Sequence, residues 1–194
     1  MNDIVTRRQQ MITMRTQEKN RWQQTAQKTI KKSIEKVIAA FDKQIALLDA
    51  SLKKMIDANP DWSEKDKIIQ SVPGVEEKSS QALIAGLSEL GTLNRREVAA
   101  LVETAPRCQD SGKKLGARRI RGGRTYVRAA LYRAALNAIR DCEPIKMFYE
   151  KLREKGKSFK VTIVAAMRKL ITILNVMVKT NICWQENKTN IERS

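Results

Sequence analysis

The sequence predicts an all-α protein, in which a long N-terminal coiled-coil helix precedes a compact helical domain. Residues 1–58 contain neither proline nor glycine, the two residues that most disfavour helix. Apolar residues recur along the chain at three- and four-residue intervals, and no segment shows convincing strand alternation. We therefore expect a linker helix over residues 1–58, a helical domain over 59–184 and a polar tail over 185–194.

One long helix, or two, is expected over residues 3–58. Its apolar residues are spaced close to a heptad seam, so this helix needs a partner helix in the same chain or in another. A helix of this length extends beyond one small core, which favours a coiled coil between copies and a homo-oligomer. The alternative is a helix packed on its own domain. The seam consists of Ile30, Ile34, Val37, Phe41, Ile45, Leu48, Leu52 and Met55.

A tight turn between two helices is expected at residues 72–75, Val-Pro-Gly-Val. The turn resembles that of the helix-hairpin-helix DNA-binding motif, in which backbone N–H groups face a phosphate. Gly74 is the candidate contact. Glu76 and Glu77 follow, with Glu76 where the motif has glycine, and two carboxylates would repel a phosphate. The alternative is therefore a helical hairpin that only packs.

Capping and helix-breaking residues set further helix limits. Asn59-Pro60 ends the first helical region, and Ser63 with Asp66 has the spacing of a capping box, as does Asn94 with Glu97. Later helices are expected over residues 125–141, 144–155 and from 158 or 160 to about 180, with Gly156 ending the second of them. The buried face of the first comprises Val127, Ala130, Leu131, Ala134, Ala135, Leu136 and Ile139.

A basic loop precedes and enters the helix predicted over residues 125–141. Residues 107–133 hold nine cations and one acid, Asp110. A polyanion is the natural partner, because Lys and Arg that neutralise phosphates release counterions. Glycines would let backbone N–H groups approach a phosphate. A solvated loop without a partner is the alternative. The cations are Arg107, Lys113, Lys114, Arg118, Arg119, Arg121, Arg124, Arg128 and Arg133.

The net charge and the hydropathy of the chain limit the kinds of partner that it can bind. The formal net charge of +17 points to nucleic acid first and to an anionic membrane surface second. No signal peptide is visible. The apolar run 161–178 is interrupted by Arg168 and Lys169, so we expect a buried or amphipathic helix and no membrane span.

The histidine and cysteine content limits the metal sites, disulfides and catalytic mechanisms that the chain can have. The chain has no histidine, and its three cysteines form no CxxC pair, so neither a zinc site nor a disulfide is expected. A reducing cytosol is the expected compartment. Ser-His and Cys-His catalysis are excluded by composition, and the scattered carboxylates suggest no metal site.

Three stretches together resemble one family of bacterial transposases. They are Pro73-Gly74-Val75, residues 92–136 with the series APR…DSGKK…RRI…GG…RAALY, and residues 148–178. These are similar to the C-terminal domain of the insertion-sequence transposases numbered one hundred and ten, particularly the eleven-eleven subgroup. The resemblance covers residues 60–184, and the leading helix resembles that family's linker coiled coil.

The resemblance implies a composite active site. In the family, a RuvC-like domain with four metal-binding carboxylates joins a serine of the DSG motif. That serine attacks a DNA phosphodiester and forms a covalent link, and a structured guide RNA directs target choice. Ser111 is then the nucleophile, in a loop shaped by Asp110 and Gly112, and magnesium is expected only with the RuvC-like domain. The implied contacts to DNA or RNA are Arg107, Lys113, Lys114, Arg118, Arg119, Arg121, Arg124 and Arg128.

The chain also departs from the family. The RuvC-like domain is not in this sequence, and Glu76 and Glu103 stand where glycine is usual. Cys108 and Gln109 replace the usual Asn-Arg before the DSG motif. We therefore expect a truncated copy, located with the bacterial nucleoid in the cytoplasm, that folds but does not cut DNA alone. The alternatives are a non-catalytic nucleic-acid-binding module, acting on intact transposase through its coiled coil, and a basic structural protein.

Overall fold

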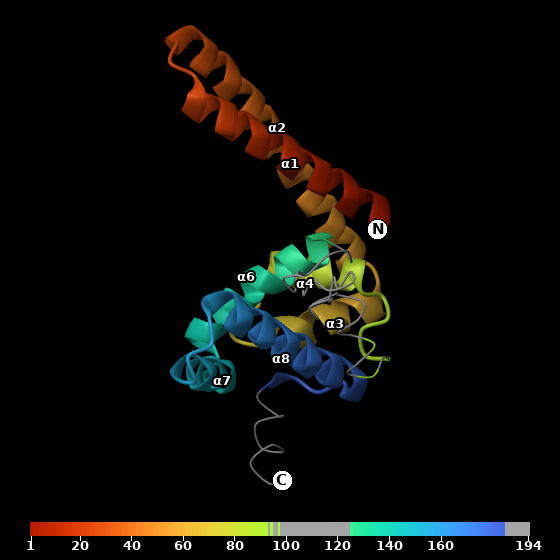
Figure 1. Cartoon of the computed structure of the whole chain (residues 1–194). Coiled ribbons are helices and arrows are strands. Elements are labelled where there is room, and N and C mark those ends of the chain that lie inside the picture. Colours follow the sequence, from red (N-terminus) through yellow and green to blue (C-terminus); the bar gives the residue numbers. More distant parts are fainter. Residues whose placement is uncertain (93, 95–96, 98–124, 185–194) are drawn as a thin grey trace, which may run out of the picture. The chain divides into compact units, whose positions relative to one another are not determined.

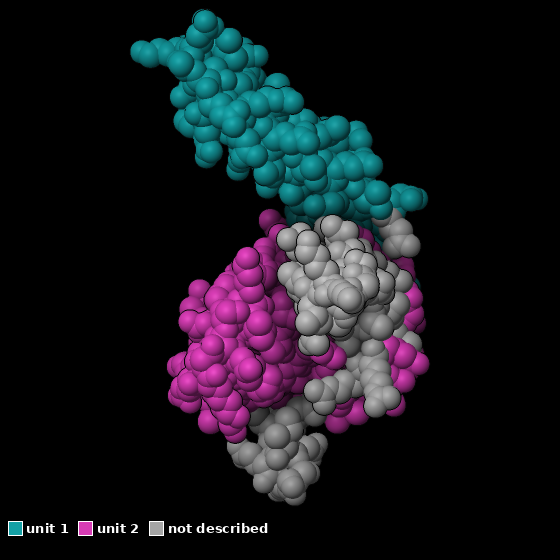
Figure 2. All heavy atoms as spheres, viewed as in Figure 1, with its two compact units in different colours: residues 1–60 teal, residues 61–194 magenta. Residues whose placement is uncertain are grey.

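The computed structural model describes residues 1–92, 94, 97 and 125–184, and every regular element in that part is helical (Figure 1). The predicted all-α class is therefore confirmed. The chain divides into two compact units, Met1–Pro60 and Asp61–Ser194 (Figure 2). The described helices are α1 (Asn2–Gln24), α2 (Lys28–Asp57), α3 (Pro60–Gln70), α4 (Glu77–Gly86), α6 (Thr125–Asp141), α7 (Glu143–Glu154) and α8 (Phe159–Thr180).

The first unit is an antiparallel hairpin of α1 and α2 (Figure 1). The helix breaks at residues 25–27, where Thr25 and Gln27 adopt extended backbone. Three side-chain contacts cross the hairpin, each seven residues from the next on both helices, which gives a regular register. They join Arg8 to Asp49, Arg15 to Asp42 (2.5 Å) and Trp22 to Glu35 (2.9 Å).

The apolar seam predicted on α2 is divided between two faces of that helix. Ile45 and Leu52 are buried, whereas Ile30 and Val37 are 46% and 40% exposed. The side chains of α1 bind Asp42 and Asp49, which lie on a side of α2 that is rotated from the centre of the seam. The chain thus supplies a partner helix for α2 itself, and pairing with a second copy stays a prediction.

We expect Asp49→Ala to destabilise the hairpin more than Asp42→Ala. The side chains of Arg8 and Asp49 are only 15% and 17% exposed, against 27% and 50% for Arg15 and Asp42. Loss of the shielded carboxylate should cost about 1–2 kcal/mol, because a partly buried guanidinium loses an acceptor. Loss of the open pair should cost about 0.5 kcal/mol. Hydrogen exchange of the α1 amides in both variants measures the difference, and equal protection would contradict this ranking.

The core of the second unit forms where α6 and α8 pack together with α4 and α7. α6 contributes mainly alanine, which lets neighbouring helices approach closely, and α8 contributes the larger side chains. The fully buried side chains include Val127, Ala130, Leu131, Ala134, Ala135 and Ala138 of α6 and Ala166, Leu170, Ile171 and Leu174 of α8.

Helix α8 is the predicted apolar helix. Its length and a mean hydropathy of 1.8 would by themselves allow it to cross a membrane. Half of that apolar window is buried inside the protein, where α8 packs against α6 and α7. Lys169 of α8 donates to the Pro144 carbonyl (2.9 Å) and lies over the Phe148 ring, and burial lowers the pKa of this ammonium group. These contacts are those of a core helix.

Two local expectations are wrong. Ser63 does not cap a helix, because α3 already begins at Pro60; Asp66 instead accepts hydrogen bonds from Ser80 of α4 and from Gln70. Leu136 is 38% exposed, since the buried face of α6 is completed by Ala138, which is covered by the turn at residues 72–75. The predicted limits of α6 and α7 and the end at Gly156 are confirmed.

Candidate nucleic-acid interface

The turn at residues 72–75 lies directly on the backbone of α6. The Val75 N–H donates to the Val72 carbonyl (3.0 Å), and Gly74 has a φ of +89°. A Cβ atom at Gly74 would be 2.4 Å from the backbone nitrogen of Ala138 and 2.6 Å from the carbonyl carbon of Asn137. Only glycine fits this contact. The close backbone approach that requires glycine here is therefore to α6.

Glu76, the departure from the helix-hairpin-helix pattern, is bound to α6. Its carboxylate accepts a hydrogen bond from the Asn137 amide (3.0 Å), while its carbonyl accepts from Ser79 and Ser80 at the start of α4. No side-chain hydrogen bond caps α4. The carboxylate is thus held by a specific donor on a neighbouring helix, where it helps to fix the turn.

A charged pair lies at the C-terminal end of α6, in the same region as Glu76. The Arg140 guanidinium donates two hydrogen bonds to the Asp141 carboxylate, at 2.7 and 2.8 Å. The hydrogen bond and the negative charge of Asp141 raise the pKa of Arg140, and the charge of Glu76 raises it by a smaller amount. The hydrogen bond from Arg140 in turn lowers the pKa of Asp141. Because the charges of these three described residues largely compensate one another, they add no net positive charge beside the turn.

The other end of α6 is anchored to α4, and it is there that the basic loop enters the helix. A Cβ atom at Gly86 would be 2.2 Å from a methyl carbon of Val127 and 2.7 Å from the Tyr126 ring. Arg128, one residue on from Val127, is half-buried. The turn meets α6 at Ala138, ten residues or about 15 Å along the helix from Arg128. The structure therefore does not bring Gly74 and Arg128 together.

The chain is also anchored where it leaves the described part before the loop. The Gly91 N–H donates to the buried Asn175 side chain of α8 (2.8 Å). The predicted capping box is confirmed, because the Asn94 N–H donates to Glu97 (2.8 Å) and the Glu97 N–H donates back to Asn94 (3.0 Å). The chain is thus held in place by contacts with the helical domain on both sides of the segment that contains the basic loop.

Most predicted site residues lie outside the described residues. Of the predicted set, the structure describes Gly74 and Arg128. Sequence reasoning missed Asn137 and Asn175, because their partners are 61 and 84 residues away and no local pattern marks such pairs. Among the described residues, no group of three or more His, Cys, Asp or Glu could hold a metal ion. The predicted residues outside the described part are Arg107, Ser111, Lys113, Lys114, Arg118, Arg119, Arg121 and Arg124.

The sequence of this chain is similar to the sequences of several known proteins. Residues 66–150 match the sequence model of the transposase IS116/IS110/IS902 family. The pilin gene-inverting proteins of Moraxella bovis and Moraxella lacunata are each 25% identical over 148 residues, which is 74% of this chain and 46% of theirs. The insertion element IS110 uncharacterized 43.6 kDa protein of Streptomyces coelicolor is 22% identical over 156 residues, 79% of this chain and 37% of its own. The chain thus spans less than half the length of these relatives, and its sequence is similar to those of IS110-type proteins.

Proposed function

We propose that this chain is the serine-bearing part of a DNA transposase or recombinase of the IS110 type, within the eleven-eleven subgroup. The observation that carries the proposal is the match of residues 66–150 to that transposase family, because the matched segment contains Ser111 and the basic loop. The names of the relatives, a gene-inverting protein and an insertion-element protein, support a role in DNA rearrangement.

In the proposed reaction, the Ser111 hydroxyl oxygen attacks a phosphorus of the DNA backbone. A P–O bond forms to serine, a P–O bond of the DNA breaks, and the departing strand end leaves as a hydroxyl. Serine needs a base or a metal for activation, and this chain has no histidine. Magnesium held by a RuvC-like domain, which these 194 residues do not include, would neutralise the attacked phosphate. We therefore propose that this chain alone does not cut DNA.

The basic loop would hold the nucleic-acid backbone around Ser111. Its cations, from Arg107 to Arg128, would contact phosphates of DNA and of a structured guide RNA. The contacts of Gly91 with α8 and of Gly86 with α6 support this role, because they fix the chain on both sides of the loop. We place the protein in the bacterial cytoplasm with the nucleoid, on DNA and not on a membrane, with copies paired through the N-terminal hairpin.

Covalent trapping tests this proposal. The chain is incubated with labelled element-end DNA, magnesium and cellular RNA, with and without a RuvC-like domain of the family, and is then denatured. A protein–DNA adduct that requires the added domain would support a divided active site. If DNA is retained on a native gel but no adduct forms, the alternative function, a non-catalytic binding module, is favoured.

DNA binding should weaken steeply with salt. If about six phosphates are contacted, the affinity should fall on the order of 10³-fold between 50 and 200 mM salt, because each neutralised phosphate releases counterions. Fluorescence anisotropy of a labelled duplex at several salt concentrations measures the slope. Binding that is insensitive to salt would contradict a role for the basic loop.

A further inference from the structure

The closed end of the α1–α2 hairpin carries most of the first unit's net positive charge. Residues 19–36, here called the hairpin tip, hold six cations and one carboxylate, a formal net charge of +5. The rest of the unit, residues 1–18 and 37–60, holds six cations and five carboxylates. All of the tip cations except Lys31 are exposed, and Arg21 forms an ion pair with Glu18, which lies outside the tip. The tip cations are Lys19, Arg21, Lys28, Lys31, Lys32 and Lys36.

A stripe of lysines runs along one face of α2 in the tip. Lys28, Lys32 and Lys36 follow one another at four-residue steps, so their exposed side chains are neighbours on the helix surface. Like charges at this spacing destabilise a helix. The carboxylates Glu35 and Asp42 are instead bound to Trp22 and Arg15 of α1. A polyanion laid along the stripe would relieve the repulsion between the lysines.

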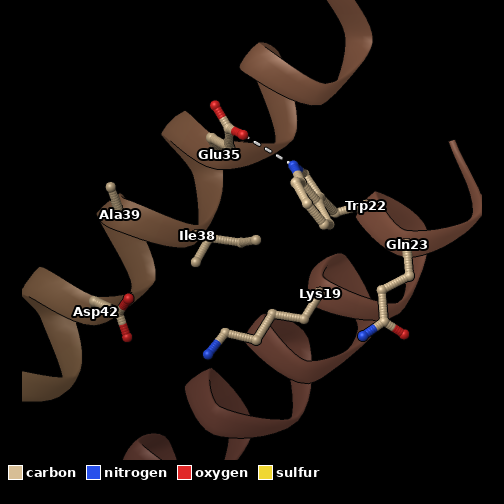
Figure 3. A pocket seen from close by; sticks show the side chains of 7 residues that line it. All are labelled: Lys19, Trp22, Gln23, Glu35, Ile38, Ala39 and Asp42. Atoms are coloured by element: carbon tan, nitrogen blue, oxygen red, sulfur yellow. Dashed lines mark hydrogen bonds between the residues drawn. The ribbon is translucent and has the colours of Figure 1, made fainter. Parts of the chain in front are cut away.

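A pocket of about 440 Å³ opens between α1 and α2, with Trp22 on its wall (Figure 3), and its lining on α2 begins at Glu35, the residue before Lys36. The indole N–H donates to Glu35 (2.9 Å), which fixes the ring, and the Lys31 ammonium lies 4.3 Å from the ring centroid. Trp22 remains 36% exposed. Ile38 and Ala39 add apolar surface to the pocket. The pocket is also lined by charged residues, among them Lys19, Glu35 and Asp42. An aromatic ring at the edge of such a pocket, with cations nearby, is an arrangement that binds unpaired nucleotides.

We propose that the hairpin tip binds an unpaired RNA strand, with a base in the pocket against Trp22 and phosphates along Lys28, Lys32 and Lys36. A duplex does not fit, because its bases are stacked and paired and cannot reach the ring. RNA is favoured over DNA by the two carboxylates that line the pocket. A carboxylate has about four acceptor positions, so each can still accept from a ribose 2′-OH, a donor that DNA lacks.

The test uses the full chain and labelled twelve-nucleotide strands of oligo(U) and oligo(dT), together with a DNA duplex of the same length. Replacing Lys28, Lys32 and Lys36 with Gln should weaken oligo(U) binding roughly ten-fold or more and reduce the salt slope by about two, because three phosphate contacts are lost. Trp22→Leu should weaken it roughly ten-fold, and Trp22→Phe should keep most of the affinity, because a ring is still present for stacking. Circular dichroism checks that each variant is helical.

The matched control removes three exposed lysines from the second unit, Lys151, Lys155 and Lys157. If this control weakens oligo(U) binding as much as the tip variant, the effect is one of net charge and the proposal is overturned. If the tip variant weakens oligo(U) and oligo(dT) binding equally, the choice of RNA is overturned, and if it weakens duplex binding as much as oligo(U) binding, the whole proposal is overturned. The inference rests on the residues of the hairpin tip and not on the reaction proposed for Ser111, so its failure would leave the proposed function standing.

Discussion

Ser111→Ala should abolish the covalent protein–DNA adduct and lower strand transfer roughly 10³-fold or more when the RuvC-like domain is supplied. Alanine has no hydroxyl to form the phosphoserine link, and loss of a nucleophile removes a whole reaction path and not a single contact. Phosphate contacts made by the basic loop do not need the hydroxyl, so DNA affinity should change less than two-fold. Denaturing gels of labelled DNA measure the adduct, and anisotropy measures the affinity.

Two controls separate chemistry from folding. Ser111→Cys keeps a nucleophilic atom at the position and should restore a weak adduct, because a thiolate can also attack phosphorus. Ser88→Ala removes a hydroxyl from an exposed serine outside the proposed active site and should leave the adduct unchanged. An adduct that persists in Ser111→Ala would show that another residue is the nucleophile or that the link forms elsewhere.

Gly74→Ala should lower the stability of the second unit by about 3 kcal/mol or more, and its melting temperature by roughly 10 °C. The added Cβ would lie 2.4 Å from the Ala138 backbone nitrogen, and backbone atoms cannot move aside without displacing the turn or α6. The φ of +89° adds strain for any residue with a Cβ. Thermal unfolding followed by circular dichroism measures the effect.

Gly156→Ala is the matched control for the steric part of this effect. Gly156 also has a positive φ, +72°, but a Cβ atom there would meet nothing within 4 Å. Only backbone strain remains, so the loss should be about 1 kcal/mol. If Gly74→Ala melts like Gly156→Ala and loses DNA affinity instead, then Gly74 serves the phosphate contact expected of a helix-hairpin-helix turn, and its packing role is minor.

Local signals explain why much of the fold could be predicted from the sequence alone. The limits of α6 and α7 follow from the apolar period and from Pro144 and Gly156, and the Asn94–Glu97 capping box needs only its own four residues. The same holds for the basic loop, its serine and the +17 charge, which are properties of composition and order. None of these features depends on distant parts of the chain.

The tertiary structure alone decided which faces and residues meet. The face of α2 that meets α1 is selected by contacts such as Arg8–Asp49, 41 residues apart, and the seam on α2 does not indicate it. Likewise, Gly74 could be assigned to a phosphate from its motif, but a Cβ atom added there would meet the backbone of α6, 64 residues away at Ala138. Periodicity shows that a helix has a buried face, whereas the identity of the covering element depends on packing among all the helices. That is why the helices were predictable and the surroundings of the candidate site were not.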